Sequence, residues 1–339
     1  MAAPEVTAAA TTRARTTVDR AEVLDSLLRR RLVFVAGKGG TGKSTMAAAL
    51  ALLAARRGKR VLCIEVDAKG SLPFCLGSEP VGFSPRTVQP GISCLAMHAE
   101  ESLQEYLRIY FKVPRFTRLT PLARVFEFVA TGVPGAKDML TVGKIAYEEK
   151  RRDGDRPTWD LIIVDSEATG HVLPQLHAAR ALMELAKGGI IRSQVQWIDA
   201  ILTDPQRTAL TICALCEEMP VVEAIELHDR ARAETGIDIG ACFLNRTFAL
   251  SVGARQLKPL ERIVEARPEK VEEALGGDPE ALLDGLRLAR RLSDATLECS
   301  KRLSEEMTCP VVEIPVQAGA RPGLATTRLV AGALEAGVA

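Results

Sequence analysis

Hydrophobic positions along the chain fall into short unbroken runs that alternate with stretches of helical spacing. The helical spacing covers 44–57, a segment opening near Pro220, and 324–335. Apolar runs without polar alternation are typical of parallel strands that are covered on both faces. We therefore predict an α/β fold with a doubly wound, mostly parallel sheet. The runs expected to form its strands are 32–36, 60–66, 92–98, 159–165, 208–214, 240–245 and 310–315.

Two longer helical stretches, 99–152 and 257–307, interrupt this alternation. We predict that they are helical insertions lying together above the carboxyl edge of the sheet. Residues 1–30 begin with an Ala- and Thr-rich stretch and are expected to form a flexible tail, and 31–339 a single domain. Apolar residues at helical spacing in 119–147 indicate either core packing or a groove for a client protein.

Composition narrows the functional classes. With 44 basic and 43 acidic residues the net charge is +1, which argues against a nucleic-acid partner held by a positive field. Aromatic residues make up only 4%, which disfavours base stacking. No apolar run approaches the roughly 18 residues that crossing a bilayer needs, and the start lacks a signal segment. The protein is expected to be cytoplasmic, either free or peripheral to the membrane.

A phosphate-loop pattern, G-x-x-x-x-G-K-[ST], lies between a predicted strand and a predicted helix at 37–44. Glycines let backbone N–H groups surround a polyphosphate, and the helix dipole favours the same anion. Lys43 is expected to bridge the β- and γ-phosphates, and the Ser44 hydroxyl to bind Mg²⁺. Lys38 is either a solvated loop lysine or a cation that reaches a partner's nucleotide. The residues expected around the nucleotide here are Gly37, Lys38, Gly39, Gly40, Thr41, Gly42, Lys43, Ser44 and Thr45.

Two carboxylates end predicted strands close to this loop. Asp165 closes Leu161–Val164, a pattern typical of a Mg²⁺-binding Walker B strand, and is expected to hold the ion through a water. Asp67 is either the residue that orients the attacking water or an ordinary strand-end residue. Glu65 is a weaker candidate for the same role.

The loop, with its extra lysine, resembles the deviant Walker A loop of ArsA-type ATPases, a family of arsenite-pump ATPases and tail-anchored-protein targeting factors. The resemblance implies a P-loop NTPase fold, ATP and Mg²⁺ as cofactors, and a dimer that encloses two nucleotides. In that dimer Lys38 would be the lysine that crosses to the partner. Asp67 corresponds to the first residue of the family's switch I motif, although residues 68–70 depart from it.

Other short segments carry the same resemblance. In the switch II region Thr169, Gly170 and His171 match, and Gly170 is expected to approach the γ-phosphate through its N–H. The strand-ending pair Asn245-Arg246 resembles the family's adenine-binding segment. Pro315 opens a loop at the position where the family surrounds the purine and ribose.

Cysteine usage adds one open question. The eight cysteines are irregularly spaced, which is typical of reduced thiols. Cys213 and Cys216 form a C-x-x-C pair that, with a second copy, would suit zinc. Its position differs from that of the targeting factors, which favours Cys213 as a buried strand residue.

The resemblance implies an ATP hydrolase in which Asp67, Lys38 and Lys43 are catalytic. A nucleotide-driven dimer switch would couple hydrolysis to a client or a membrane partner. The dimer is either a homodimer or a heterodimer with a paralogous ATPase. Two alternatives remain: a targeting chaperone for tail-anchored or other hydrophobic clients, and a weakly hydrolysing regulatory partner of a paralogous ATPase.

Overall fold

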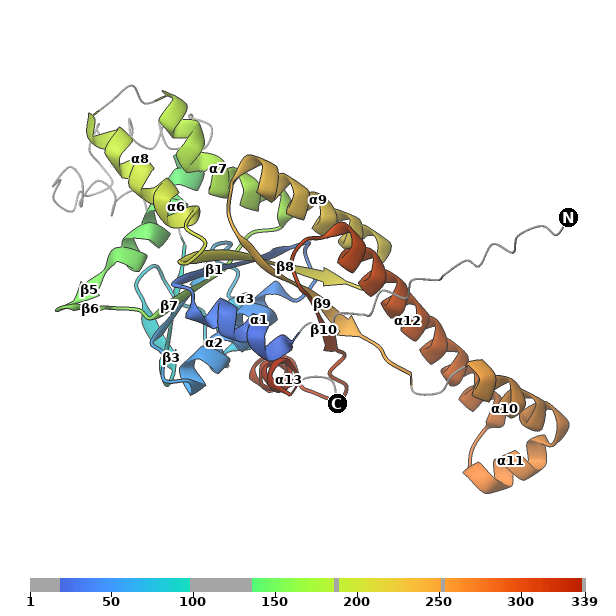
Figure 1. Ribbon diagram of the computed structural model, residues 1–339. Helices are drawn as coiled ribbons and strands as arrows, with labels where there is room; N and C mark the ends of the chain where they lie inside the picture. Colours follow the sequence, from blue (N-terminus) through green and yellow to red (C-terminus); the bar gives the residue numbers. More distant parts are fainter. Residues whose placement is uncertain (1–18, 98–135, 186–188, 251–253, 337–339) are drawn as a thin grey trace, which may run out of the picture.

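An eight-stranded sheet forms the centre of the computed structural model, which describes residues 19–97, 136–185, 189–250 and 254–336 (Figure 1). Its strands are β1 Leu32–Gly37, β2 Val61–Glu65, β3 Arg86–Gln89, β4 Ile92–Ala96, β7 Leu161–Asp165, β8 Thr208–Leu215, β9 Ile239–Thr247 and β10 Val311–Pro315, and a separate hairpin consists of β5 Arg152–Asp153 and β6 Arg156–Pro157. The helices are α1 Arg20–Arg29, α2 Lys43–Arg56, α3 Ser71–Cys75, α6 Ala136–Lys150, α7 Thr169–Leu185, α8 Gly189–Leu202, α9 Glu218–Glu234, α10 Ala254–Ala266, α11 Pro268–Leu275, α12 Pro279–Glu306 and α13 Leu324–Glu335.

The strands run in the order β10-β9-β8-β1-β7-β2-β4-β3, and every neighbouring pair is parallel except β3 with β4. Helices α6, α7, α8, α9 and α12 contribute to the core on one face, and α1, α2, α3 and α13 to the core on the other. Within β1 successive side chains alternate between these two cores, as the pleat of a strand requires. The predicted α/β, doubly wound, mostly parallel fold is confirmed.

The register of the strands gathers the predicted site residues at one edge of the sheet. Val35 of β1 lies beside Asp165 of β7, and Glu65 of β2 lies on the other side of that aspartate. Gly37 lies beside Cys213 of β8. Because parallel strands end at the same edge, the phosphate loop and the switch segments all begin there.

The expectation of a flexible tail over 1–30 is wrong for its last part. Residues Arg20–Arg29 form α1, which begins at an Asp19 cap whose carboxylate accepts the N–H of Ala21 at 2.9 Å. The apolar side chains of this helix are buried against the sheet; they are Val23, Leu24, Leu27 and Leu28. The helix therefore belongs to the folded domain.

We expect Leu27→Ala to destabilise the protein by about 3 kcal/mol, because a leucine that is 1% exposed leaves a cavity when truncated. Asp25→Ala is the matched control: it removes only the exposed ion pair with Arg57, which is worth less than about 1 kcal/mol. Urea unfolding measures both. Equal stability of the two variants would show that α1 does not pack as described.

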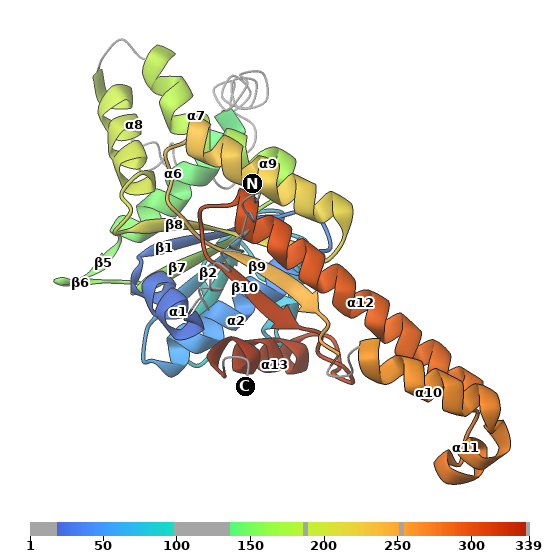
Figure 2. The same ribbon diagram turned by 45° about the vertical axis from the view of Figure 1, so that its right-hand side comes forward.

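The described part of the first predicted insertion, α6, does not lie beside the second insertion. Helix α6 packs beside α7 and α8, and buries Val142, Ile145 and Ala146 in the core. The hairpin of α10, α11 and α12 instead projects from the opposite side of the molecule, as both views show (Figures 1 and 2). The two segments are separate because α6 packs on α7 and α8, whereas the end of α12 packs on α9, β9 and β10. Residues 98–135, which hold most of the first insertion, lie outside the described residues.

Several other elements follow the sequence pattern only in part. The pair α7–α8 and the antiparallel edge strand β3 were not predicted from the hydrophobic pattern. Strand positions were predicted to within about two residues, because continuous apolar runs mark buried parallel strands. None of the helices in the described parts of the chain combines the length and apolar character that spanning a bilayer requires.

Candidate active site

The phosphate loop has the backbone that its glycines allow. Gly37, Gly40 and Gly42 have φ of 145°, 86° and 94°, a region that favours glycine. A Cβ on Gly37 would lie 2.3 Å from the carbonyl oxygen of Cys213, and one on Gly42 would lie 2.3 Å from Asn245 Nδ2. A Cβ on Gly40 would meet nothing within 4 Å. The loop is therefore pressed against the sheet at its two ends and open in the middle.

The carbonyl oxygen of Lys38 accepts two hydrogen bonds from side chains of the loop. It accepts the Thr41 Oγ1 hydroxyl at 2.9 Å and the Lys43 Nζ ammonium at 3.2 Å. Helix α2 begins directly afterwards at Lys43, so its first N–H groups and its dipole are directed at the open middle of the loop. This arrangement of backbone donors, helix N-terminus and lysine is suited to a polyphosphate.

Asp165 faces the loop as a buried carboxylate. It is 5% exposed, and no described residue hydrogen-bonds its Oδ1. Burial raises its pKa to about 7, although a hydrogen bond from Ser44 and the charge of Lys43 act in the opposite direction. An unpartnered carboxylate oxygen beside a serine hydroxyl and a phosphate loop fits the oxygen donors that Mg²⁺ prefers. Ser44 and Asp165 are thus the residues that would hold the ion.

Asp67 lies in a strained and exposed loop just after β2. Its carboxylate forms an ion pair with Lys69, and the intervening Ala68 has φ of 46°. A left-handed alanine is uncommon, and such strain is concentrated at functional loops. The Asp67 side chain is 46% exposed, and its role toward a water stays a prediction.

Glu65 has a structural role instead. Its Oε2 accepts the N–H of Gly70 and its Oε1 accepts the N–H of Leu72, both at 3.0 Å. These two bonds fix the loop that carries Asp67 and satisfy donors at the start of α3. The Glu65 carboxylate is 3% exposed and both of its oxygens accept backbone N–H groups, so it holds the loop in place. Which carboxylate orients a water stays a prediction.

Asn245 contacts the phosphate loop directly. Its Nδ2 donates to the carbonyl oxygen of Thr41 at 2.9 Å, and its Oδ1 accepts the N–H of Arg246 at 2.9 Å. Arg246 itself has a left-handed backbone, with φ of 56°, which is uncommon for a residue other than glycine. Pro315 ends β10 beside Thr247, at the same edge. The structure therefore shows Asn245 as a brace for the loop, while recognition of a base stays a prediction.

The switch II segment opens α7. Thr169 is the first residue of this helix, and Gly170 lies next to it with open space where a Cβ would point. His171 is exposed and lies 3.8 Å from the Glu167 carboxylate. The contact of Gly170 with a γ-phosphate stays a prediction.

A residue that the sequence patterns missed, Glu223 of α9, connects two parts of the site. Its Oε1 lies 2.5 Å from Lys38 Nζ, and its Oε2 accepts the Thr169 hydroxyl at 3.3 Å. Glu223 belongs to no motif and lies in an acidic helix, so no sequence signal distinguishes it from its neighbours. Only the fold places it beside the phosphate loop.

Two further predicted residues have local partners. The Thr45 hydroxyl lies 3.6 Å from the Cys75 sulfur, and its contact with a nucleotide stays a prediction. Cys213 is a buried strand residue, as favoured, and burial raises its pKa to about 12. In the part of the chain that the structure describes, no three or more His, Cys, Asp or Glu side chains are arranged to hold a metal. Whether Cys213 and Cys216 share zinc with a second copy stays untested.

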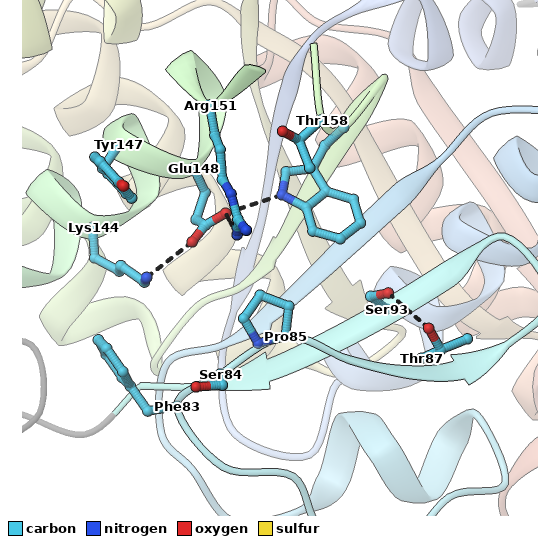
Figure 3. A pocket seen from close by; sticks show the side chains of 11 residues that line it. Phe83, Ser84, Pro85, Thr87, Ser93, Lys144, Tyr147, Glu148, Arg151 and Thr158 are labelled. Atoms are coloured by element: carbon cyan, nitrogen blue, oxygen red, sulfur yellow. Dashed lines mark hydrogen bonds and ion pairs between the residues drawn. The ribbon is translucent and has the colours of Figure 1, made fainter. Parts of the chain in front are cut away.

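A pocket of about 550 Å³ lies at the opposite edge of the sheet (Figure 3). Glu148 lies at its centre and accepts hydrogen bonds from Lys144 at 2.9 Å and the Trp159 indole at 3.0 Å. Burial acts to raise the pKa of Glu148, but Lys144, Trp159 and Arg151 together hold it below its usual value. These contacts join α6 to the start of β7, so the pocket is distinct from the phosphate loop.

Comparison with known proteins agrees with this geometry. The sequence profile of the anion-transporting ATPase family matches residues 30–190. ATPase BagA of Mycobacterium tuberculosis is 33% identical over 243 residues, which cover 70% of this chain and 71% of that protein. The arsenical pump-driving ATPase of Acidiphilium multivorum is 27% identical over 228 residues (60% and 37%), and ATPase ASNA1 homolog 1 of Paramecium tetraurelia is 28% identical over 145 residues (43% and 42%). The chain therefore belongs to the ArsA-type anion-transporting ATPase family, whose fold is that of a P-loop NTPase.

Proposed function

We propose that the protein is a Mg²⁺-dependent ATPase in which ATP drives formation of a dimer and hydrolysis releases it. One observation carries this proposal: the open middle of the glycine loop faces a buried carboxylate oxygen of Asp165 that no described residue satisfies. A triphosphate with its magnesium ion supplies both of the missing partners. The family's ATPases support the same activity.

The chain's own residues have separate tasks in this reaction. The loop N–H groups and Lys43 bind the β- and γ-phosphates, and Ser44 and Asp165 hold Mg²⁺, which when bound neutralises charge on the phosphates. Asp67 turns from Lys69 to orient the attacking water. Lys38 of a second copy completes the charge around the γ-phosphate. Gly170 approaches that phosphate, and Asn245, Arg246 and Pro315 form the edge at which the base is placed.

The output of the cycle is mechanical coupling to a client or a membrane partner, through a homodimer or a heterodimer with a paralogous ATPase. The relatives named as an arsenical pump-driving ATPase and an ASNA1 homolog support such coupling. The projecting hairpin supports an apolar partner, because three leucines of its helix α12 are each about half exposed. They are Leu288 at 54%, Leu292 at 46% and Leu297 at 50%.

A second candidate is a weakly hydrolysing regulatory subunit. The ion pair of Asp67 with Lys69 favours it, since a lysine at this position competes for the carboxylate that would orient water. In this case nucleotide binding and dimer formation persist, and turnover is slow until a partner displaces Lys69.

Asp67→Asn tests the proposal. We expect turnover of Mg²⁺·ATP to fall by about 10²- to 10⁴-fold, because an amide no longer orients and polarises the water, while nucleotide affinity changes little. Single-turnover kinetics and calorimetric titration with AMPPNP measure the two effects, and the exposed Asp153→Asn is the control. Higher turnover in Lys69→Ala than in the wild type would favour the regulatory candidate. A wild-type chain without Mg²⁺-dependent nucleotide affinity would contradict both.

A further inference from the structure

Lys38 does not extend from the phosphate loop into solvent. Its Nζ lies 2.5 Å from Glu223 Oε1 in the same chain, and the two side chains are 36% and 25% exposed. An ion pair in this partly desolvated position is stronger than a freely exposed one, because water screens it less. The ammonium that would act on a partner's nucleotide therefore has a fixed internal partner in the single chain.

Glu223 is well fixed for this contact. Its helix α9 packs on β1, β8 and α7, and the neighbouring Val221, Ala224 and Ile225 are buried in the core. The same carboxylate accepts the hydroxyl of Thr169 at 3.3 Å. Thr169 begins α7, four residues after Asp165. The Glu223 carboxylate thus connects Lys38 of the phosphate loop with Thr169, the first residue of the switch II helix.

We propose that Glu223 is a positioning residue that holds Lys38 within its own chain until nucleotide-driven movement of Thr169 and a partner's phosphate release it. This inference rests on the proposed function and adds an internal ion pair that delays closure of the dimer. Glu223 keeps the lysine from the γ-phosphate of a second copy, and the pair must separate before the dimer closes. Because Thr169 shares the carboxylate, a change at the start of α7 weakens the hold on Lys38.

The first measurement needs neither nucleotide nor a dimer. Acetylation of lysine amines by an N-hydroxysuccinimide ester, followed by mass spectrometry, reports how available Lys38 is in the free chain. We expect Glu223→Gln to raise the labelling rate of Lys38 about two- to fivefold, relative to the exposed Lys270 in the same molecule. Glu226→Gln, an exposed neighbour on α9, is the control and should leave the rate unchanged. Equal Lys38 labelling in all three proteins would overturn the proposal.

The second measurement follows dimer formation by analytical ultracentrifugation as Mg²⁺·AMPPNP is added. In Glu223→Gln the concentration for half-maximal dimer should fall about two- to fivefold, while the affinity of the dilute single chain stays within twofold. Thr169→Val should shift the midpoint in the same direction by a smaller factor. Melting temperatures confirm that the variants are folded, and Thr169→Val supplies the test if Glu223→Gln is not.

A double variant separates this inference from the proposed function. In a Lys38→Met background, Glu223→Gln should no longer move the midpoint of dimer formation. An undiminished shift would mean that Glu223 acts by repelling phosphate, and would overturn the proposal that Glu223 holds Lys38. If Lys38→Met alone leaves dimer formation and turnover unchanged, the transfer of Lys38 to a partner's nucleotide fails. In that case faster labelling of Lys38 in Glu223→Gln would still show the internal hold.

Discussion

Replacing the two loop lysines should affect different steps. Lys43→Ala should lose ATP affinity, whereas Lys38→Ala should keep ATP affinity and lose turnover. Lys43 begins α2 and its Nζ lies within the loop, on the carbonyl oxygen of Lys38. A charge-assisted bond to phosphate is worth about 1.5–3 kcal/mol, so we expect affinity to fall by about 10- to 150-fold. Calorimetric titration of the dilute single chain with AMPPNP measures this loss.

Lys38 differs because its ammonium is bound to Glu223, outside the loop's interior. If it stabilises charge on a partner's γ-phosphate as an arginine finger does, its removal should lower kcat by about 10³-fold or more. Single-turnover rates at saturating ATP measure this effect, and affinity should change less than threefold. A Lys38→Ala chain that hydrolyses ATP at the wild-type rate would contradict the dimeric mechanism without affecting the role of Lys43.

Asp165→Asn should make the nucleotide-free protein more stable at high pH and should greatly reduce the stabilisation by Mg²⁺ with nucleotide. The pKa of Asp165 is raised to about 7 by burial, whereas in the unfolded chain it is near 3.8. Between these values the folded state keeps a proton that the unfolded state has released, so stability falls as pH rises through this window. The asparagine variant has no such proton, and its advantage should grow to about 4 kcal/mol by pH 8.

Urea unfolding at pH 4.5, 6 and 8 in a chelating buffer tests this expectation, because the difference between the two proteins should widen with pH. Mg²⁺ with nucleotide should then stabilise the wild type at pH 8 and have a much smaller effect on the variant. Parallel pH profiles for the two proteins would show that Asp165 is not held as a buried acid. The exposed Asp153→Asn should follow the wild type throughout.

The sequence predicts the site best where chemistry fixes both residue type and spacing. The phosphate loop is such a case, since its glycines are needed for left-handed backbone at Gly40 and Gly42. The strand ahead of Asp165 is another, since an unbroken apolar run indicates a strand buried on both faces. These two features are enough to bring the loop and the carboxylate to one edge of the sheet.

Other parts of the site depend on packing between distant segments, which local patterns do not record. Glu223 looks like any surface acid of α9, and its contact with Lys38 spans 185 positions along the chain. The bond from the Asn245 amide to the carbonyl oxygen of Thr41 likewise spans 204 positions along the chain, and no local pattern indicates it. Helix α1 was missed because its four buried apolar residues lie in an otherwise polar stretch and give a weak helical pattern. Their burial depends on packing against the sheet, which the local sequence does not show.

The length of α12 has a consequence for how a small change at the nucleotide edge is felt elsewhere. The helix has 28 residues and is therefore about 42 Å long, with its carboxyl end rooted against α9, the helix that carries Glu223. Ser293 and Thr296 still accept hydrogen bonds from the segment after β9, so only the part of the helix ahead of them, about 21 Å long, extends freely. A rotation of about 5° at that point would move the far tip by about 2 Å. The hairpin thus has the proportions of a short lever that pivots where α12 leaves the segment after β9, with the exposed Leu288 and Leu292 on its free arm.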